Sequence, residues 1–265
     1  REQYVYFALK FSKPFKKSGL STMQEGAKFP PTKKTEKTEG VFFQFDMKDD
    51  QPLMIKVAIS QTSAEGAMKN LYAEAPHWDF ENYKADAKQA WNNELGRIEV
   101  SDEDAEKSTL FYTALYHCMI HPSVASDVDG KYRGRDFKIH EASGFVPYTV
   151  FSLWDTFRAL HPLFTIIQQK RTTDIVKTFL RQYQEGNRLP MWELSANETN
   201  CMIGFHSVSV IADAYAKNIS GIDPELAYKA MMDAANYQDL GTPTFNKNTY
   251  LQIDDESESV SKTLE

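Results

Sequence analysis

The stretch YTVFSLWDTFRALHPLF, residues 148–164, contains the pattern on which the fold prediction turns. A run of aromatic and aliphatic residues, typical of a buried helix, is interrupted by Asp155 and Arg158 and followed by His161 and Pro162. Asp155 and Arg158 are three residues apart, so they would be neighbours on a helix. Two interpretations stay open: an ion pair inside a helical core, or a helix end that lines a polar pocket.

A second polar segment, MWELSANETNCMIGFHS at residues 191–207, combines carboxylate, amide and hydroxyl side chains with a tryptophan. This combination suits recognition of a polyhydroxylated ring, because flat aromatic rings stack on apolar faces while polar groups bind hydroxyls. The alternative is that Asn197 or Thr199 is an ordinary helix cap and Glu193 an exposed acid.

Composition places the chain among ordinary globular proteins. Its 265 residues are 42% hydrophobic and 25% charged, which allows one large domain or two smaller ones. A net charge of -7 argues against nucleic acid or an anionic membrane as the main partner. No apolar run approaches the roughly 18 residues that a membrane span needs. The aromatic content of 13% fits either an aromatic core or sugar-facing surfaces.

The first sixty residues predict β structure. Residues 4–11 alternate between polar and apolar in the period-2 pattern of a half-buried strand, and 41–45 and 53–59 form two further strands. Residues 13–40, rich in Lys, Thr, Pro and Gly, are expected to form an exposed loop with room for a short strand. A sandwich usually has about seven strands. We therefore expect this β part to be the end of a larger domain.

From residue 63 the pattern becomes helical, and the chain is predicted to be mostly α. Five of the expected helices, joined by long loops, span 64–72, 81–95, 152–169, 172–185 and 202–217, and the fourth of these stops at Gly186. Another contains Phe111–Met119 and follows a capping pair of Ser101 and Asp104. Two more are expected, one with Asp223 as N-cap and Pro224 at N1, and one that begins near Val260.

The cysteines and histidines give weak signals. Cys118 and Cys201 lie on apolar helical stripes and are expected to be small buried residues rather than a disulfide or a metal pair. His117 and His121 are four residues apart, but no third metal ligand lies nearby in the sequence. His206 is more typical of a core histidine than of a catalytic base.

The segment DVDGKY, residues 127–132, predicts a hairpin turn at Asp129-Gly130. A calcium loop is the alternative, although the later ligands of an EF-hand are missing. The sequence has no Gly-rich phosphate loop, zinc-ligand spacing or serine nucleophile elbow, which argues against a nucleotide enzyme, a zinc enzyme or a serine hydrolase.

The two polar segments carry a resemblance to a known family. LWDTFRALHPL at 153–163, followed by NETNCMIGFHS at 197–207, resembles glycoside hydrolase family 92, the bacterial exo-acting α-mannosidases. Further segments in the same order extend the resemblance over nearly the whole chain: YVYFALKFSKPF (4–15), WNNELGRIEV (91–100), FYTALYHCMIHP (111–122) and SDVDGKYRG (126–134).

The resemblance implies a fold. Members of this family join an N-terminal β-sandwich to a C-terminal (α/α)6 barrel through linker helices. By resemblance, residues 1–62 are the end of the sandwich, 63–100 the helical linker and 101–265 the first half of the barrel. The chain would then be an internal segment of a longer α+β polypeptide that is secreted or periplasmic.

The resemblance also implies an activity. Family members hydrolyse terminal α-mannosides with inversion, assisted by a calcium ion. The expected partners are therefore mannose-containing glycans, with α-1,2-linked mannose as the expected linkage. The family's acid motif E-(G/A)-N-A-W-Q-Y and calcium motif G-N-E-P do not occur in this sequence, nor does the aspartate-rich segment of the base. We therefore expect no catalytic residue and no principal calcium ligand in this chain, and an isolated segment without turnover.

By resemblance, the chain supplies the sugar-holding part of the site. Asp155 corresponds to the aspartate that binds the terminal mannose, and Trp154 and Arg158 support it. Glu198 and Thr199 are expected to line the same pocket. The alternative function is a non-catalytic carbohydrate-binding or helical scaffold module.

Overall fold

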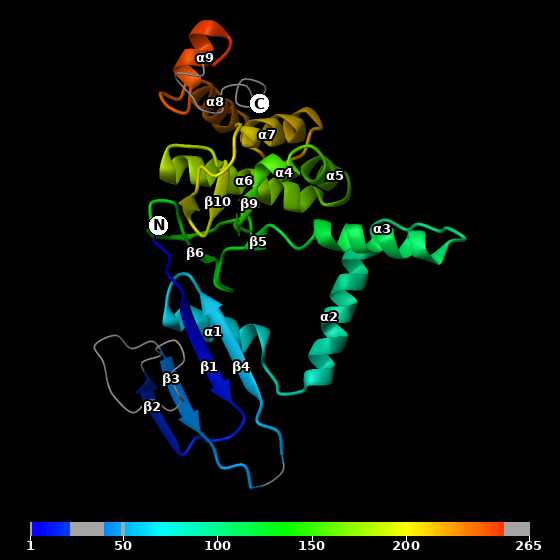
Figure 1. Ribbon diagram of the computed structural model, residues 1–265, viewed down its shortest axis with the longest axis vertical. Helices are drawn as coiled ribbons and strands as arrows, with labels where there is room; N and C mark the ends of the chain where they lie inside the picture. Colours follow the sequence, from blue (N-terminus) through cyan, green and yellow to red (C-terminus); the bar gives the residue numbers. More distant parts are fainter. Residues whose placement is uncertain (1, 22–39, 49–50, 252–265) are drawn as a thin grey trace.

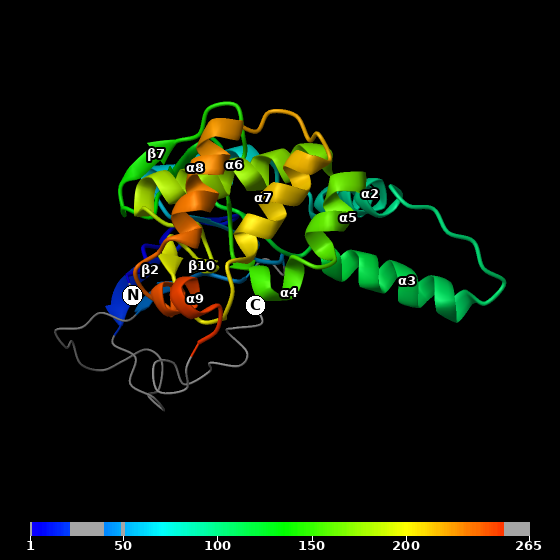
Figure 2. The ribbon, with the colours of Figure 1, turned by 90° about the horizontal axis from the view of Figure 1, so that it is seen from above.

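The computed structural model describes residues 2–21, 40–48 and 51–251. The longer strands come first along the chain and lie at one end of the molecule, and most of the helices lie at the other end (Figure 1). Between these parts, two helices extend to one side, and the second projects well clear of the rest (Figure 2). The arrangement agrees with the predicted mixture of α and β structure.

Two antiparallel strand pairs form the β part. β1 (Tyr6–Phe11) pairs with β4 (Ile55–Ser60), and β2 (Lys17–Ser21) pairs with β3 (Gly40–Gln44). The three strands predicted from the sequence are confirmed. β2 is the short strand that the prediction for residues 13–40 allowed within the loop.

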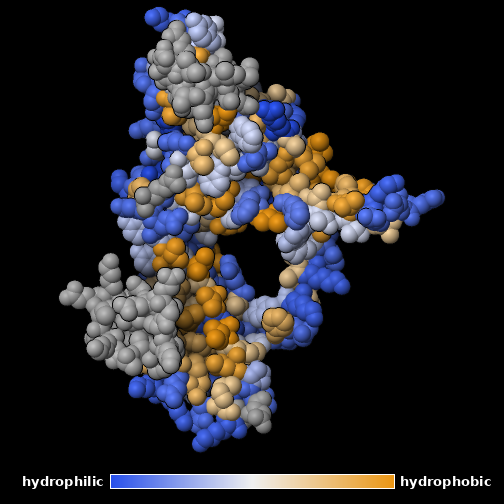
Figure 3. Space-filling view, in the orientation of Figure 1, coloured by the Kyte–Doolittle hydropathy of each residue, from blue (hydrophilic) through white to orange (hydrophobic). Residues whose placement is uncertain are grey.

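The β1–β4 pair has one packed face and one open face, since successive side chains of a strand point to opposite sides. Helix α1 (Ala64–Glu74) covers the packed face, where Ala8, Ala67 and Leu71 form a small buried cluster. Apolar side chains on the open face are 53–64% exposed and form a visible patch (Figure 3): Phe7, Ile55, Val57 and Ile59.

Helices α2 (Phe80–Leu95) and α3 (Ala105–Cys118) form the lateral extension. Asp79 caps α2 by accepting the Asn82 N–H, and Asp104 caps α3 by accepting the Glu106 N–H. The predicted cap at Ser101 is therefore wrong, because the helix begins only after Asp104. No residue of α2 is buried.

Four short strands lie between α3 and residue 150, where no helix is predicted from the sequence. β5 (Ser123–Val124) pairs with β8 (Tyr148–Thr149), and β6 (Lys131–Arg133) pairs with β7 (Ile139–Glu141). The chain turns at Gly130, whose φ is 83°, but this turn precedes β6. The predicted turn at Asp129-Gly130 is confirmed, since the Gly130 N–H donates to the Asp127 carbonyl at 2.9 Å and the Asp127 N–H donates to the Lys131 carbonyl at 2.8 Å. It does not join two strands, because the β6–β7 hairpin closes at residues 134–138.

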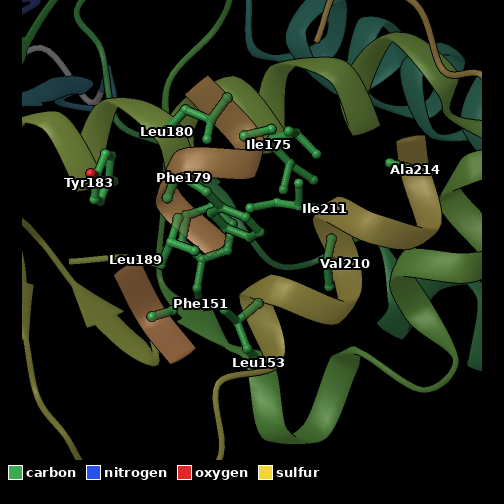
Figure 4. Close-up of a cluster of buried hydrophobic side chains, with 14 of the residues drawn as sticks. Phe151, Leu153, Ile175, Phe179, Leu180, Tyr183, Leu189, Val210, Ile211 and Ala214 are labelled. Atoms are coloured by element: carbon green, nitrogen blue, oxygen red, sulfur yellow. The ribbon is translucent and has the colours of Figure 1, made fainter. Parts of the chain in front are cut away.

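A helical core forms the largest packed part of the described chain. Its elements are β9 (Phe151–Ser152), α4 (Leu153–Thr156), α5 (Leu160–Ile167), α6 (Gln169–Gly186), α7 (His206–Ala216) and α8 (Pro224–Ala235), with α9 (Thr242–Asn248) beyond them. Phe179 of α6 is fully buried and packs edge-on against Phe151, with ring centroids 4.8 Å apart (Figure 4). Among the described residues, no helix is both long and apolar enough for a bilayer crossing.

The helix predicted over 152–169 is wrong as a single element. It is broken between α4 and α5, and Pro162 gives the reason. Proline has no N–H to donate to the carbonyl four residues earlier, and its ring collides with that carbonyl in a helix interior. At the third position of α5 the proline is tolerated, because first-turn N–H groups have no helical partner.

The other predicted helices are confirmed with shifted ends. The helix expected at 202–217 begins at His206, because Gly204 has a φ of 84°, which is not helical. Glycine suits this position also because a Cβ there would lie 2.4 Å from the His206 ring. α6 ends with Asn187 in the left-handed region rather than with Gly186. Asp223 caps α8 as predicted. The helix expected near Val260 lies outside the described residues.

A buried carboxylate joins the β part to the helical part. Asp127 is 5% exposed and accepts hydrogen bonds from Ser60 Oγ at 2.7 Å, from Thr62 Oγ1 and from Asn70 Nδ2 at 2.8 Å. The Asn70 amide also donates to the carbonyl of Ile59 and accepts the N–H of Val128. The predicted alternative of a calcium loop is not supported. Donors from the protein occupy the Asp127 carboxylate, and Asp129 forms ion pairs with Lys69 and Lys131.

Replacing Asn70 is expected to destabilise this junction. Asn70→Ala leaves a buried carboxylate oxygen, a carbonyl and an N–H short of one hydrogen bond each, which should lower the free energy of unfolding by about 2–4 kcal/mol. Urea denaturation measures this value. Asn93→Ala, at an exposed position of α2, is the control and should change it by less than about 0.5 kcal/mol. Equal effects of the two substitutions would contradict the assignment.

Candidate functional site

A three-stranded antiparallel sheet brings the two polar segments together. β10 (Trp192–Leu194) is its central strand, between β9 and β11 (Asn197–Glu198). Trp192 lies opposite Ser152, and Glu193 lies opposite Phe151 on one side and Glu198 on the other. Segments about forty residues apart in the sequence are therefore adjacent in space.

Asp155 lies one helical turn beyond β9, and its carboxylate is open to solvent. It accepts a hydrogen bond from Ser152 Oγ. Arg158 is also exposed, and its guanidinium lies 5.0 Å from the centroid of the Phe157 ring. Within the described residues Asp155 forms no ion pair with Arg158, so the interpretation as a core ion pair is wrong. Trp154, the residue before Asp155 in the sequence, is 39% exposed.

Glu198 directs its carboxylate inward, toward the backbone of its own hairpin. Oε1 accepts the N–H groups of Trp192 at 2.9 Å and Asn200 at 3.0 Å, and Oε2 accepts that of Met191 at 2.9 Å. The Arg135 guanidinium lies 3.9 Å from Oε2, and both side chains are 8% exposed. This carboxylate therefore holds the backbone that enters β10 and the backbone that leaves β11.

Thr199 continues the same pairing beyond β11. Its N–H and its Oγ1 both donate to the carbonyl of Trp192, at 3.1 and 2.8 Å. Both residues are half-buried. The hairpin thus holds Trp192 and Thr199 side by side.

Glu193 is the most buried acid of the site, at 1% exposure. Its oxygens accept hydrogen bonds from Thr149 Oγ1 at 2.9 and 3.0 Å, from the Val150 N–H at 3.1 Å and from the Ala196 N–H at 2.7 Å. Burial raises the pKa of Glu193 to about 7, although these donors and Arg135 act in the opposite direction. The sequence alternative of an exposed acid is wrong.

The chain segment after the hairpin packs against the end of α4. The ring of His206 stacks on that of Phe157, with centroids 3.8 Å apart and an interplanar angle of 8°. His206 is 5% exposed, as expected for a core histidine. This contact is a second link between the two polar segments.

The remaining sequence candidates are not brought together. In the part of the chain that the structure describes, no group of three or more His, Cys, Asp or Glu side chains could hold a metal ion. Cys118 and Cys201 are free thiols. Cys201 is exposed, so its prediction as a buried residue is wrong, because the loop before α7 replaces the helical stripe on which the prediction rested.

Sequence reasoning missed two residues that build the site, Thr149 and Arg135. Arg135 comes from the turn between β6 and β7, and its Nη1 donates to the carbonyl of Arg188 at 2.7 Å. Thr149 lies at the end of β8 and binds Glu193, 44 residues away. Thr149 belongs to the first polar segment, but nothing in the sequence links it to Glu193, and no local motif singles out Arg135.

The comparisons with known proteins identify the class. Residues 66–265 match the model of the glycosyl hydrolase family 92 catalytic domain, and the chain belongs to this family. The family predicted from the two polar segments is thereby confirmed.

Three relatives show how the chain relates to known proteins. It is 37% identical to a family GH92 α-mannosidase from Bacteroides thetaiotaomicron, with a TM-score of 0.86 over 98% of this chain and 36% of that one. A family GH92 inverting mannosidase from the same organism is 29% identical, with the same TM-score and the same shares. A secreted glycosidase of Arthroderma benhamiae is 28% identical over 207 residues, 75% of this chain and 22% of the relative. The chain thus spans about a third of the solved relatives.

The pKa of Glu193 gives a testable pH dependence. The pKa of Glu193 is raised from 4.5 in the unfolded chain to about 7 in the folded protein. Between pH 4.5 and 7, Glu193 therefore keeps a proton in the folded protein that it has lost in the unfolded chain. The Glu193 contribution to the free energy of unfolding should therefore fall as the pH rises from 4.5 to 7, by on the order of 3 kcal/mol. Glu193→Gln should lack this contribution.

Urea denaturation of both proteins between pH 4 and 8 measures the difference. Burial lowers the pKa of His161 to about 4, and this contributes a slope of opposite sign in both proteins. The informative quantity is therefore the difference between wild type and variant. A difference that does not change with pH would contradict the buried, proton-binding state of Glu193.

Proposed function

We propose that the polypeptide containing this chain is an α-mannosidase that hydrolyses terminal α-mannosides, with α-1,2-linked mannose as its main substrate. The observation that carries the proposal is the pairing of β9 with β10, which joins the strand that precedes Asp155 to the Trp192–Thr199 hairpin. Family membership supports it, and so does a solved structure of a 37% identical α-mannosidase in complex with mannoimidazole.

In this proposal the site binds the terminal mannose. Asp155 accepts hydrogen bonds from sugar hydroxyls, because its carboxylate is exposed and its one described partner is a serine hydroxyl. We expect Trp154, which is 39% exposed, to contact the sugar ring, and the exposed Arg158 to support Asp155. In the same proposal Glu198 and Thr199, on the hairpin, line the sugar pocket. Glu198 contributes mainly by holding the backbone of Met191, Trp192 and Asn200 in place.

The proposed architecture is the end of a β-sandwich at 1–62, a helical linker at 63–100 and half of an (α/α)6 barrel at 101–265. The apolar open face of the β1–β4 pair supports the first part, since a two-stranded sheet is marginal alone and a second sheet would cover that face. The lack of buried residues in α2 supports the second part, because a helix that stays outside the packed core can connect two domains.

The proposed mechanism is single-displacement hydrolysis with inversion, assisted by calcium. Inversion needs a general acid and a general base with carboxyl groups about 6.5–9.5 Å apart. We expect the acid, the base and the main calcium ligands outside this chain. This chain's residues bind and orient the sugar. A secreted or periplasmic location is proposed, in line with the name of the fungal relative.

Asp155→Asn tests the sugar-binding role. The amide presents an N–H2 group where the carboxylate accepts hydrogen bonds, so kcat/KM of the full-length enzyme on α-mannosides should fall about 10- to 100-fold. Asp86→Asn, at an exposed position of α2, is the matched control and should leave kcat/KM unchanged. Wild-type kcat/KM in the Asp155 variant would exclude the proposed contact.

Stereochemistry and metal dependence test the mechanism. The first product released from an α-1,2-mannobiose is expected to be β-mannose, observed by proton NMR before mutarotation. EDTA should abolish turnover, and added calcium should restore it. An α-configured first product would contradict inversion. Mannose binding without any turnover by the full-length polypeptide would favour a non-catalytic carbohydrate-binding module.

A further inference from the structure

The Glu193 carboxylate lies where three chain segments meet. It belongs to β10, and its hydrogen-bond donors come from the end of β8, from the junction between β8 and β9 and from the turn between β10 and β11. Oε1 binds Thr149 and Ala196, and Oε2 binds Thr149 and Val150. A single buried side chain therefore ties together segments from both polar regions of the site.

The backbone at these donors is held in an unfavourable conformation. Val150, Ser195 and Ala196 have φ angles of 69°, 49° and 68°, in the left-handed region. Such angles are uncommon for residues other than glycine and are genuine outliers for a β-branched residue such as Val150. Strained residues persist only where surrounding interactions over-determine them.

Glu193 supplies those interactions for all three residues. Val150 and Ala196 donate their N–H groups to its carboxylate directly. Ser195 donates its N–H to Thr149 Oγ1 at 2.9 Å, and the same hydroxyl donates its proton to Glu193. In its ionised form, above about pH 7, the carboxylate accepts every one of these bonds, so it then acts as an acceptor-only centre for a set of donors.

The strained residues set the direction of the two segments that carry the candidate ligands. Val150 redirects the chain between β8 and β9, and β9 ends at Ser152, whose hydroxyl binds Asp155. Ser195 and Ala196 form the turn from β10 to β11, which leads to Thr199. Their conformations therefore decide how far Asp155 lies from the hairpin.

The hydrogen bonds between Glu193 and Thr149 are buried, since the two residues are 1% and 5% exposed. Both residues line a small cavity of about 20 Å³ between the β6–β7 hairpin, α6 and the turn from β10 to β11. Arg135 lines it too, with its side chain 8% exposed and near the Glu198 carboxylate. Hydrogen bonds in such surroundings are strong when made and costly when broken.

We propose that Glu193 is a positioning residue that fixes the placement of Asp155 relative to the Trp192–Thr199 hairpin. It does not itself contact the sugar, because its oxygens are buried and occupied by Thr149, Val150 and Ala196. The geometric part of this proposal stands on the contacts above. The part that concerns sugar affinity rests on the proposed function.

The test compares Glu193→Gln with the wild type in the full-length polypeptide. The glutamine has nearly the same shape, but its N–H2 group faces the donors that the lost oxygen accepted. Hydrogen–deuterium exchange should become at least about tenfold faster at the amides of 149–152 and 193–199. The affinity for mannoimidazole, measured by titration calorimetry, should fall about tenfold, the effect of misplacing one hydrogen bond to a charged group.

Asp127→Asn is the matched control. It also alters a buried carboxylate with several donors, but at the junction of the β part, so it should lower the melting temperature without faster exchange at 149–152 or 193–199. Thr149→Val is the second variant and decides the result if Glu193→Gln does not fold. It removes the hydroxyl between Ser195 and Glu193 and should accelerate exchange at the same turn.

Wild-type exchange rates at both segments in a folded variant would overturn the proposal. Faster exchange with unchanged mannoimidazole affinity would overturn the positioning role as well. If the wild type neither binds mannoimidazole nor cleaves mannosides, the proposed function fails, and the exchange rates still decide whether Glu193 holds the two segments.

Discussion

The pairing of β9 with β10 is the interaction on which the rest of the site depends. Two residue pairs, Trp192 with Ser152 and Glu193 with Phe151, join segments that the sequence separates by forty residues. So short a ladder could not hold by itself, and the helical core fixes its position. Phe151 packs against Phe179 in the middle of α6, so the strand that leads to Asp155 is anchored in the most buried part of the chain.

The acids of the site divide into two kinds by what they bind. Glu193 and Glu198 accept hydrogen bonds from backbone N–H groups and are buried, whereas Asp155 is exposed and binds only a serine hydroxyl among the described residues. A buried carboxylate saturated by backbone donors can hold a loop but has little capacity left for a ligand. The carboxylates of Glu193 and Glu198 thus hold the loop, whereas the carboxylate of Asp155 faces solvent.

The sequence predicted the elements that have a local cause. Asp223 and Pro224 define the start of α8, and alternation along 4–11 defines β1, because caps and periodicity act over a few residues. The two polar segments were also recognised. The short strands β9, β10 and β11 were not, since two or three residues show no periodicity. Nor could Thr149 be connected to Glu193, because only the folded chain brings them together.

The exposure of Asp155 and Trp154 has a consequence for the proposed function. A carboxylate in water gains little from binding a hydroxyl, because water already supplies equivalent hydrogen bonds. Strong binding requires walls that exclude water on the side that the described residues leave open, and these raise the strength of each contact. The chain spans about a third of the solved mannosidases that it resembles. An α-mannosidase site built on Asp155 therefore needs further side chains that close over it, and the preformed hairpin held by Glu193 gives them a fixed surface on which to close.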